Sequence, residues 1–217
     1  MNTSNTSPID IPSLILRILS TALFLLVFYG ITVGQTTYTF TGEADDRYEN
    51  PANWIPAYPG TEIPANSIVF IEGIAIAHAE ILVSGILHIG AGASLEIESA
   101  SLSIHSSGKL MNDGDLLAPS IQNAGMINNN LAATLNAGTL ISTSGAMINN
   151  LMAAQLLVQG NLYNGGLFNN YSFCAVQGNF LNAFSFSEMP NSEMKISGQH
   201  IEQLIAHDDD RLTLNAR

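Results

Sequence analysis

Short segments of alternating apolar and polar residues run through the middle of this 217-residue chain. Leu95 and Ile97 alternate with polar neighbours, and so do Leu102 and Ile104 in the next segment. A period of two is typical of strands with one buried face, and helical spacing does not persist in this region. Gly, Asn or Ser closes each segment. The pattern therefore predicts an all-β fold of many short strands.

The turn residues recur at a fixed interval. A glycine, an apolar pair and an Asn-rich corner are found in four places, and the Asn pair recurs at 128/129, 149/150 and 169/170. These spacings of 21 and 20 residues indicate a stacked repeat of about 20 residues per rung. A leucine-rich repeat has a similar period, but its motif is absent and no segment offers its helix. We therefore expect a right-handed β-helix, a solenoid, with about six rungs between Ser67 and Ala183.

The corners carry a further prediction. Gly and Asn tolerate the positive φ values that sharp corners require, and rungs stack about 4.8 Å apart. Corner side chains of successive rungs therefore lie over one another. We expect Asn129, Asn150 and Asn170 to form a ladder of hydrogen-bonded amides.

Three regions are expected along the chain. Residues 1–34 contain the long apolar stretch from Leu14 to Val33, whose uninterrupted core suits a signal peptide cleaved before Gln35. An uncleaved membrane anchor and a buried core helix are the alternatives. A lipoprotein anchor is not expected, because no cysteine lies near the cleavage site. Residues 35–66 form an aromatic N-terminal cap segment, and residues 67–217 form the solenoid. No membrane span is expected after cleavage.

Composition narrows the function. Charged residues are only 11% of the chain, and 6 basic against 18 acidic residues give a formal net charge of -12. A chain with this negative charge repels the phosphate backbone of nucleic acids, and no nucleic acid partner is therefore expected. The single cysteine, Cys174, allows no internal disulfide and is predicted to be a buried small hydrophobe. No cofactor is expected.

The candidate sites each have a plainer interpretation. Trp54 and Tyr58 fit either a sugar-stacking site or a cap over the first rung, and the cap is favoured. The acidic runs at Asp45 and Asp208 lack the spacing of calcium loops and are interpreted as solvated loops. The five histidines show no metal spacing, so no metal site is expected.

An enzymatic role is not predicted. Polysaccharide-degrading β-helices need clustered acids or a basic residue near the scissile bond. Glu96 and Glu98 lie two residues apart, but no neighbouring rung supplies a partner acid, and Lys109 is the only basic residue in the rungs proper. A polysaccharide-degrading enzyme is therefore the third-ranked alternative, and the chain has no predicted catalytic residue.

The N-terminal segment contains a series of short motifs that resembles a known group of proteins. Phe40-Thr41-Gly42, then Asn53-Trp54, Pro59-Gly60 and a Pro64-to-Val69 strand entry resemble the start of secreted Gram-negative solenoid proteins, the filamentous-haemagglutinin-like and autotransporter-like adhesins. In these a tryptophan often precedes the Asn-Trp pair, and Tyr48 stands about there. No C-terminal sorting or barrel domain is recognisable. The resemblance implies a right-handed β-helix on a cell surface and no particular ligand.

These observations favour a non-catalytic structural or adhesive module, secreted or on the outer cell surface, whose partners are host or matrix glycans or proteins. The alternative is a carbohydrate-binding module with its site near Trp54 and Tyr58. Further strands are expected at Met194, Ile201 and Leu212. No polar cap is visible beyond them, so the last rung is expected to associate with another copy or to continue into a longer protein.

Overall fold

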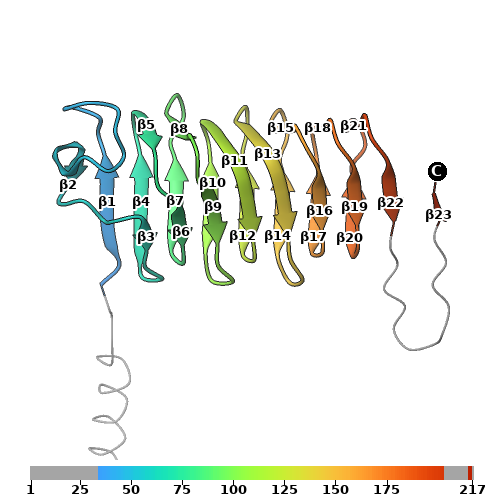
Figure 1. The fold of residues 1–217 in the computed structure, drawn as a ribbon, viewed down its shortest axis with the longest axis horizontal. Helices are drawn as coiled ribbons and strands as arrows, with labels where there is room; N and C mark the ends of the chain where they lie inside the picture. Colours follow the sequence, from blue (N-terminus) through green and yellow to red (C-terminus); the bar gives the residue numbers. More distant parts are fainter. Residues whose placement is uncertain (1–33, 203–214, 217) are drawn as a thin grey trace, which may run out of the picture. The chain divides into compact units, whose positions relative to one another are not determined.

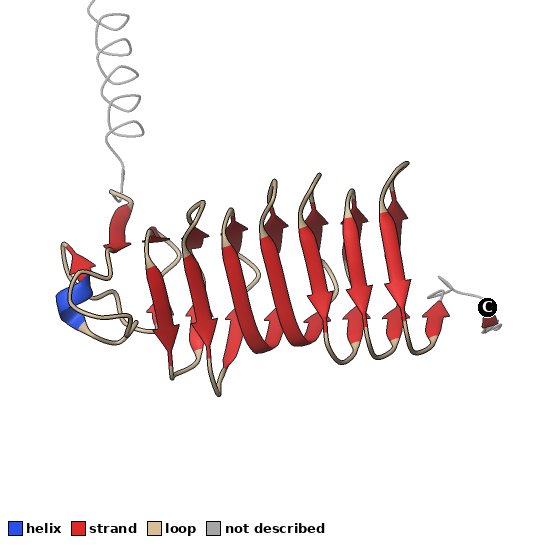
Figure 2. Ribbon diagram, turned by 90° about the horizontal axis from the view of Figure 1, so that it is seen from above, coloured by secondary structure: helices blue, strands red, loops and turns tan. Residues whose placement is uncertain are grey.

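The computed structural model describes residues 34–202 and 215–216. The predicted signal segment, apart from Gly34, and the acidic run at Asp208 lie outside the described residues. The chain divides into two units, Met1–Gln35 and Thr36–Arg217, and every strand belongs to the second. Apart from one short 3-10 helix, η1 (Pro51–Asn53), the regular elements among its described residues are all strands (Figure 2).

The strands stack into a β-solenoid of about seven turns with rungs of about 20 residues, which confirms the predicted architecture. Figure 1 shows successive rungs following one another in chain order. A rung visits three faces in turn. Face A consists of β1 (Thr36–Phe40), β2 (Trp54–Ile55), β4 (Ser67–Ile71), β7 (Ile86–Ile89), β10 (Lys109–Asn112), β12 (Met126–Asn129), β14 (Met147–Asn150), β17 (Leu167–Asn170) and β20 (Ser185–Glu188).

Two long strands, β11 (Asp115–Asn123) and β13 (Thr134–Ser142), each supply both remaining faces of their rung. Face B consists of β5 (Ile74–Ala77), β8 (Ser94–Ile97), the first parts of β11 and β13, β15 (Gln155–Val158), β18 (Phe173–Val176) and β21 (Glu193–Ile196). Face C consists of β3 (Glu62–Ile63), β6 (Ile81–Val83), β9 (Ser101–Ile104), the second parts of β11 and β13, β16 (Leu162–Asn164), β19 (Phe180–Asn182), β22 (His200–Glu202) and β23 (Asn215–Ala216).

Pairing between rungs is parallel, and the two antiparallel pairs lie at the ends, β1 with β2 and β22 with β23. In the strands of the first six rungs inward and outward residues alternate, as β12 shows, where Ile127 and Asn129 face inward. The interior is a continuous stack of Leu, Ile, Val and Ala side chains. The alternation seen in the sequence therefore determines which residues of a strand lie in the core and which lie on the surface.

The N-terminal segment covers the first rung with an aromatic cluster, as predicted. Phe40, Tyr48 and Trp54 are all buried. The Trp54 ring packs edge-on against Phe40 at 5.2 Å and against Tyr48 at 4.9 Å between ring centroids. Its indole N–H donates to the Tyr48 carbonyl oxygen at 2.7 Å. Neighbouring Asn53 is buried too; its amide oxygen accepts from the backbone of Ala44 and its amide nitrogen donates to the Arg47 carbonyl.

In four rungs the corner between faces A and B is the same turn, with a left-handed third residue. The third residues have φ values of 78° (Gly92), 63° (Ala132), 61° (Ala153) and 71° (Asn191), and each turn closes with a hydrogen bond from its fourth residue to its first. Gly and Asn suit this conformation, whereas alanine adopts it at a cost of about 1–2 kcal/mol.

We therefore expect Ala153→Gly to stabilise the protein by about 0.5 kcal/mol, because the relieved strain slightly exceeds the added entropy cost of glycine. The next residue, Ala154, is buried and has ordinary backbone geometry, so Ala154→Gly is the matched control and should destabilise. Urea unfolding midpoints compare the two variants. A lower midpoint for Ala153→Gly would contradict the expected strain.

The seventh rung is less well covered than the sixth. Phe168, Cys174 and Val176 are buried in the sixth rung. The residues in register with the first two in the seventh, Phe186 and Met194, are only partly buried. The expected strands near Met194 and Ile201 are present as β21 and β22. Leu212 lies outside the described residues, and self-association through this rung stays a prediction.

Candidate functional site

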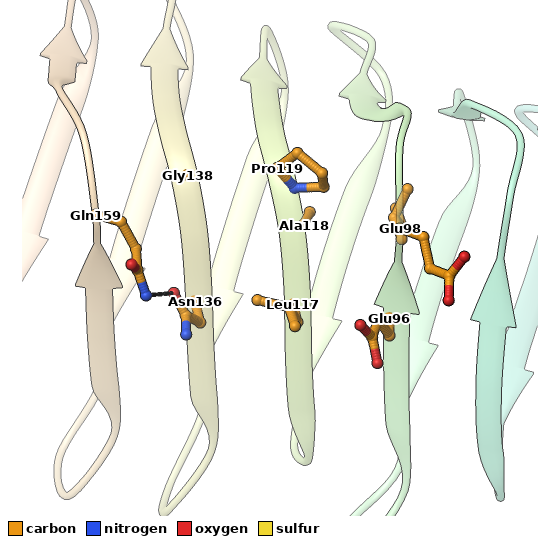
Figure 3. Close-up of a pocket in the computed structure, with 9 residues that line it drawn as sticks. Glu96, Glu98, Leu117, Ala118, Pro119, Asn136, Gly138 and Gln159 are labelled. Carbon is orange, nitrogen blue, oxygen red and sulfur yellow. Dashed lines mark hydrogen bonds between the residues drawn. The ribbon is translucent and has the colours of Figure 1, made fainter.

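A shallow groove of about 300 Å³ crosses the solenoid where faces B and C meet (Figure 3). It is hollowed because Pro119 and Gly138 stand at the bend of the long strands and offer little side chain. No larger residue fits at position 138, because a Cβ there would lie 2.2 Å from the Pro119 carbonyl oxygen of the preceding rung. The lining residues are Glu96, Ile97, Glu98, Leu117, Ala118, Pro119, Asn136, Gly138 and Gln159.

The chemistry of the groove changes from one rung to the next. Glu96 lies in register with Leu117, and Leu117 lies in register with Asn136. Leu117 is 42% exposed, and the Gln159 amide N–H donates to the Asn136 side-chain oxygen at 3.3 Å. A carboxylate, an apolar side chain and a carboxamide therefore follow one another. The two acids of this lining, Glu96 and Glu98, lie two residues apart in the same rung.

Glu98 also belongs to a three-residue cluster, with Glu49 and His78, that the sequence did not predict. His78 bridges two carboxylates, with its Nδ1 3.5 Å from Glu49 and its Nε2 3.4 Å from Glu98. The Glu49 carboxylate also accepts the backbone N–H groups of His78 and Ala79, at 2.7 and 3.1 Å. Glu49 belongs to the N-terminal segment, so these bonds fasten that segment to the first full rungs.

The same bonds set the acidity of Glu49. Partial burial on its own would raise the pKa of this carboxyl, but the hydrogen bonds from His78 and Ala79 outweigh it and lower the pKa. A carboxyl with a lowered folded-state pKa stabilises the fold fully above its unfolded pKa, about 4.3. The contribution disappears as the pH falls through the folded pKa.

We expect Glu49→Gln to destabilise the chain at pH 7 and to have a smaller effect at pH 3, where wild-type Glu49 also becomes protonated. Urea midpoints at both pH values measure the difference. Glu72, an exposed residue of the adjacent corner, provides the control Glu72→Gln, which should change neither midpoint. An equal effect of Glu49→Gln at both pH values would show that its charge contributes nothing.

The proposed sugar-stacking pair is not available on the surface. Trp54 is only 5% exposed and packs against Phe40 and Tyr48 within the cap, so a sugar cannot stack on it. Tyr58 is half-buried and packs beside Trp54, with 5.9 Å between ring centroids. Partial burial and the charge of Glu49 raise the pKa of Tyr58. This corrects the binding interpretation of Trp54 in favour of the capping one.

The predicted ladder is present and longer than expected. Each Asn amide group donates to the side-chain oxygen of the next rung: Asn112 to Asn129 at 2.8 Å, Asn129 to Asn150 at 2.9 Å, and Asn150 to Asn170 at 2.8 Å. All four residues are buried. The amide nitrogens of the first three also donate to a backbone carbonyl at the entry of face B. This inner ladder of Asn112, Asn129, Asn150 and Asn170 thus holds the corner between faces A and B in place.

Two further ladders were not predicted. On the outside of face A, Asn169 donates to Asn149 at 2.9 Å and Asn149 donates to Asn128 at 2.7 Å. At the corner between faces C and A, Asn164 donates to Asn182, and Asn182 donates to the Glu202 carboxylate, both at 2.7 Å. Asn128, Asn149 and Asn169 are the outward members of the recurring Asn pairs, so their ladder follows from the same stacking, whereas Asn164 and Asn182 lie outside these pairs.

Cys174 and His88 lie as predicted, the first buried and the second on the outward side of its strand. Cys174 is buried, and burial raises the pKa of its thiol to about 12, which leaves it unreactive. His88 faces outward, pairs with Asp113 and packs on the Phe70 ring. Asp45 is tied into its turn by the Asn53 side chain, which is the main cause of its lowered pKa.

Within residues 34–202 and 215–216, no three His, Cys, Asp or Glu side chains converge as metal ligands. No helix in the described part of the chain is long and apolar enough to cross a bilayer. Comparison with protein families, with known proteins and with solved structures finds no match. The structural class, a parallel β-solenoid with an aromatic N-terminal cap, is therefore established by the fold alone.

Proposed function

We propose that this chain is an exported, non-catalytic module of a bacterial cell surface that serves a structural and adhesive role. The observation that carries the proposal is the uninterrupted stack of rungs, which is pinned by buried amide ladders and covered at its N-terminal end by the cap. Such a stack is rigid and presents flat, repeated outer faces, the geometry that repeat proteins use for binding extended partners. The apolar leader and the adhesin-like N-terminal segment support export to a surface.

The export part of the proposal has a direct test. The full chain is expressed in a Gram-negative host, the cells are fractionated, and the N-terminus of the product is sequenced. We expect a product that begins at Gln35 and is reached by protease or antibody added outside the cells. An intact Met1 terminus in the cytoplasmic fraction would overturn the proposal.

The adhesive part is tested with beads that carry the exported chain, flowed over mammalian cells, matrix proteins and polysaccharide films. We expect retention that is lost when the same beads are heated to unfold the protein. Retention of heated and native beads alike would show nonspecific sticking and contradict a folded adhesive surface.

A polysaccharide-degrading enzyme remains the less favoured candidate. The groove at the meeting of faces B and C holds Glu96 and Glu98, but Glu98 is occupied by His78 and no acid lies opposite Glu96. A reducing-sugar assay on polysaccharide substrates, with Glu96→Gln as the variant, separates the two candidates. Release of sugar that depends on Glu96 would favour the enzyme.

A further inference from the structure

The middle rungs of this acidic protein are free of charge. Between Asp115 and Glu188 the sequence has no Asp, Glu, Lys, Arg or His. The net charge of -12 therefore resides entirely outside this segment. The fourth, fifth and sixth rungs form a neutral band around the solenoid, where a ligand gains nothing from carrying charge of either sign.

Face C carries a line of outward apolar side chains that crosses the neutral fourth, fifth and sixth rungs and ends in the seventh, at Ile201 between His200 and Glu202. Ile141 lies in register with Tyr163, Tyr163 with Leu181, and Leu181 with Ile201. Ile141 is 42% exposed and Tyr163 37%, and the other two are partly exposed. These four residues, the Tyr163 strip, cross four successive rungs at the strand spacing of about 4.8 Å. A parallel sheet is ordinarily covered on both faces, so an uncovered apolar line points to a ligand.

Amide groups line one side of the Tyr163 strip. Asn161 and Asn179 follow the stacked glycines at the corner between faces B and C, and both are exposed. The side-chain oxygen of Asn161 accepts the Asn179 backbone N–H, and that of Asn179 accepts the Gln199 backbone N–H, each at 2.8 Å. Their oxygens are therefore used and fixed in orientation. Their Nδ2 groups have no acceptor among the described residues, which leaves a row of oriented donors.

The ring of Tyr163 has a defined place on the face. It leans along β16 toward Gly165, where a Cβ would lie 3.2 Å from the ring. The glycine thus leaves room for the ring beside the backbone.

We propose that the Tyr163 strip is a binding platform for an extended neutral glycan. Sugar rings present C–H faces that stack on aromatic and aliphatic side chains, and hydroxyl groups that accept hydrogen bonds from amide N–H groups. The absence of charge around Ile141, Tyr163 and Leu181 favours a neutral polymer over an acidic or basic one. Repetition across four rungs suits a ligand with repeating units. This inference names the ligand class of the proposed adhesive surface and rests on that function.

A second copy of the chain is the other conceivable occupant. A stable protein interface buries about 800 Å² on each partner. The Tyr163 strip is one side chain wide, and its two most exposed members are less than half exposed. That area is too small for a stable dimer, whereas a single polysaccharide strand needs only a narrow line of contacts.

The test is native affinity electrophoresis of the exported chain in gels that contain soluble neutral polysaccharides, namely glucan, mannan, galactan and chitin oligomers. We expect at least one to retard the wild type, equally at low and high salt. Tyr163→Ala should weaken binding by about tenfold, the equivalent of about 1.4 kcal/mol. Tyr163→Phe should keep binding. Asn179→Asp should weaken it, since the aspartate retains the acceptor for Gln199 but loses the donor.

Leu131→Ala changes an exposed leucine at the corner between faces A and B, outside both the groove and the Tyr163 strip. It is the control and should bind like the wild type. Circular dichroism confirms that each variant folds. The proposal is overturned if no neutral polysaccharide retards the wild type, or if Tyr163→Ala binds equally. It is also overturned if sedimentation shows a dimer that Tyr163→Ala dissociates. If Tyr163→Ala beads still adhere, the adhesive function stands and only the glycan platform fails.

Discussion

Asn150→Leu is expected to lower the free energy of unfolding by about 3 kcal/mol or more, because each buried polar group left unpaired costs about 1–3 kcal/mol. Asn150 is the third member of the inner ladder. Its loss removes the acceptor of the Asn129 amide and the donor to the Asn170 oxygen. It also removes the bond from Asn150 to the Phe173 carbonyl that holds the next corner.

Asn130→Leu is the matched control, one corner earlier. Asn130 is partly exposed, and only its backbone forms hydrogen bonds: its N–H donates to the Asn112 carbonyl and its carbonyl accepts from the Ala133 N–H. A change of less than about 0.5 kcal/mol is expected there, as for other surface substitutions. Urea denaturation of both variants gives the comparison. Equal midpoints would mean that the ladder adds nothing to stability.

Gly125→Ala is expected to destabilise the protein by about 3 kcal/mol, at the upper end of the range for overpacking. A Cβ on Gly125 would lie 2.3 Å from the carbonyl oxygens of both Gly108 and His105 in the preceding rung. These are backbone atoms of a stacked rung, so they cannot move aside as a flexible side chain would.

Gly90→Ala is the control for this prediction. Its Cβ would meet only the Ile71 carbonyl oxygen at 3.2 Å, so a small loss is expected. Ala146 occupies the position in register with Gly125 one rung later, after a longer corner at residues 143–146. A Gly125→Ala variant as stable as Gly90→Ala would show that the short corner at residues 124–125 can widen in the same way.

The fold was predictable because its signals are local. Alternation along a strand such as β8 decides which side chains face the core, and the corner residues decide where the chain turns. The recurrence of the Asn pair at positions 128, 149 and 169 then placed the rungs over one another. The inner ladder followed from this stacking and needed no knowledge of distant contacts.

The candidate sites were less predictable because the repeat is irregular. Ile68 lies beside Ile86, Ile86 beside Lys109 and Lys109 beside Met126, which are steps of 18, 23 and 17 residues. A mean period of 20 therefore misplaces outward side chains by several positions. The contact of Glu49 with His78, 29 residues away, depends on the path of the N-terminal segment, which has no repeat at all.

The direction of the amide hydrogen bonds gives each ladder a dipole along the solenoid axis. In the inner ladder each N–H points toward the C-terminal end, whereas in the outer ladder of Asn128, Asn149 and Asn169 each N–H points the other way. The two columns on face A are opposed rows of dipoles whose fields cancel at a distance. The column from Asn164 through Asn182 ends on the Glu202 carboxylate. There a negative charge meets the positive end of aligned amides, the relation that favours anions at the start of an α-helix.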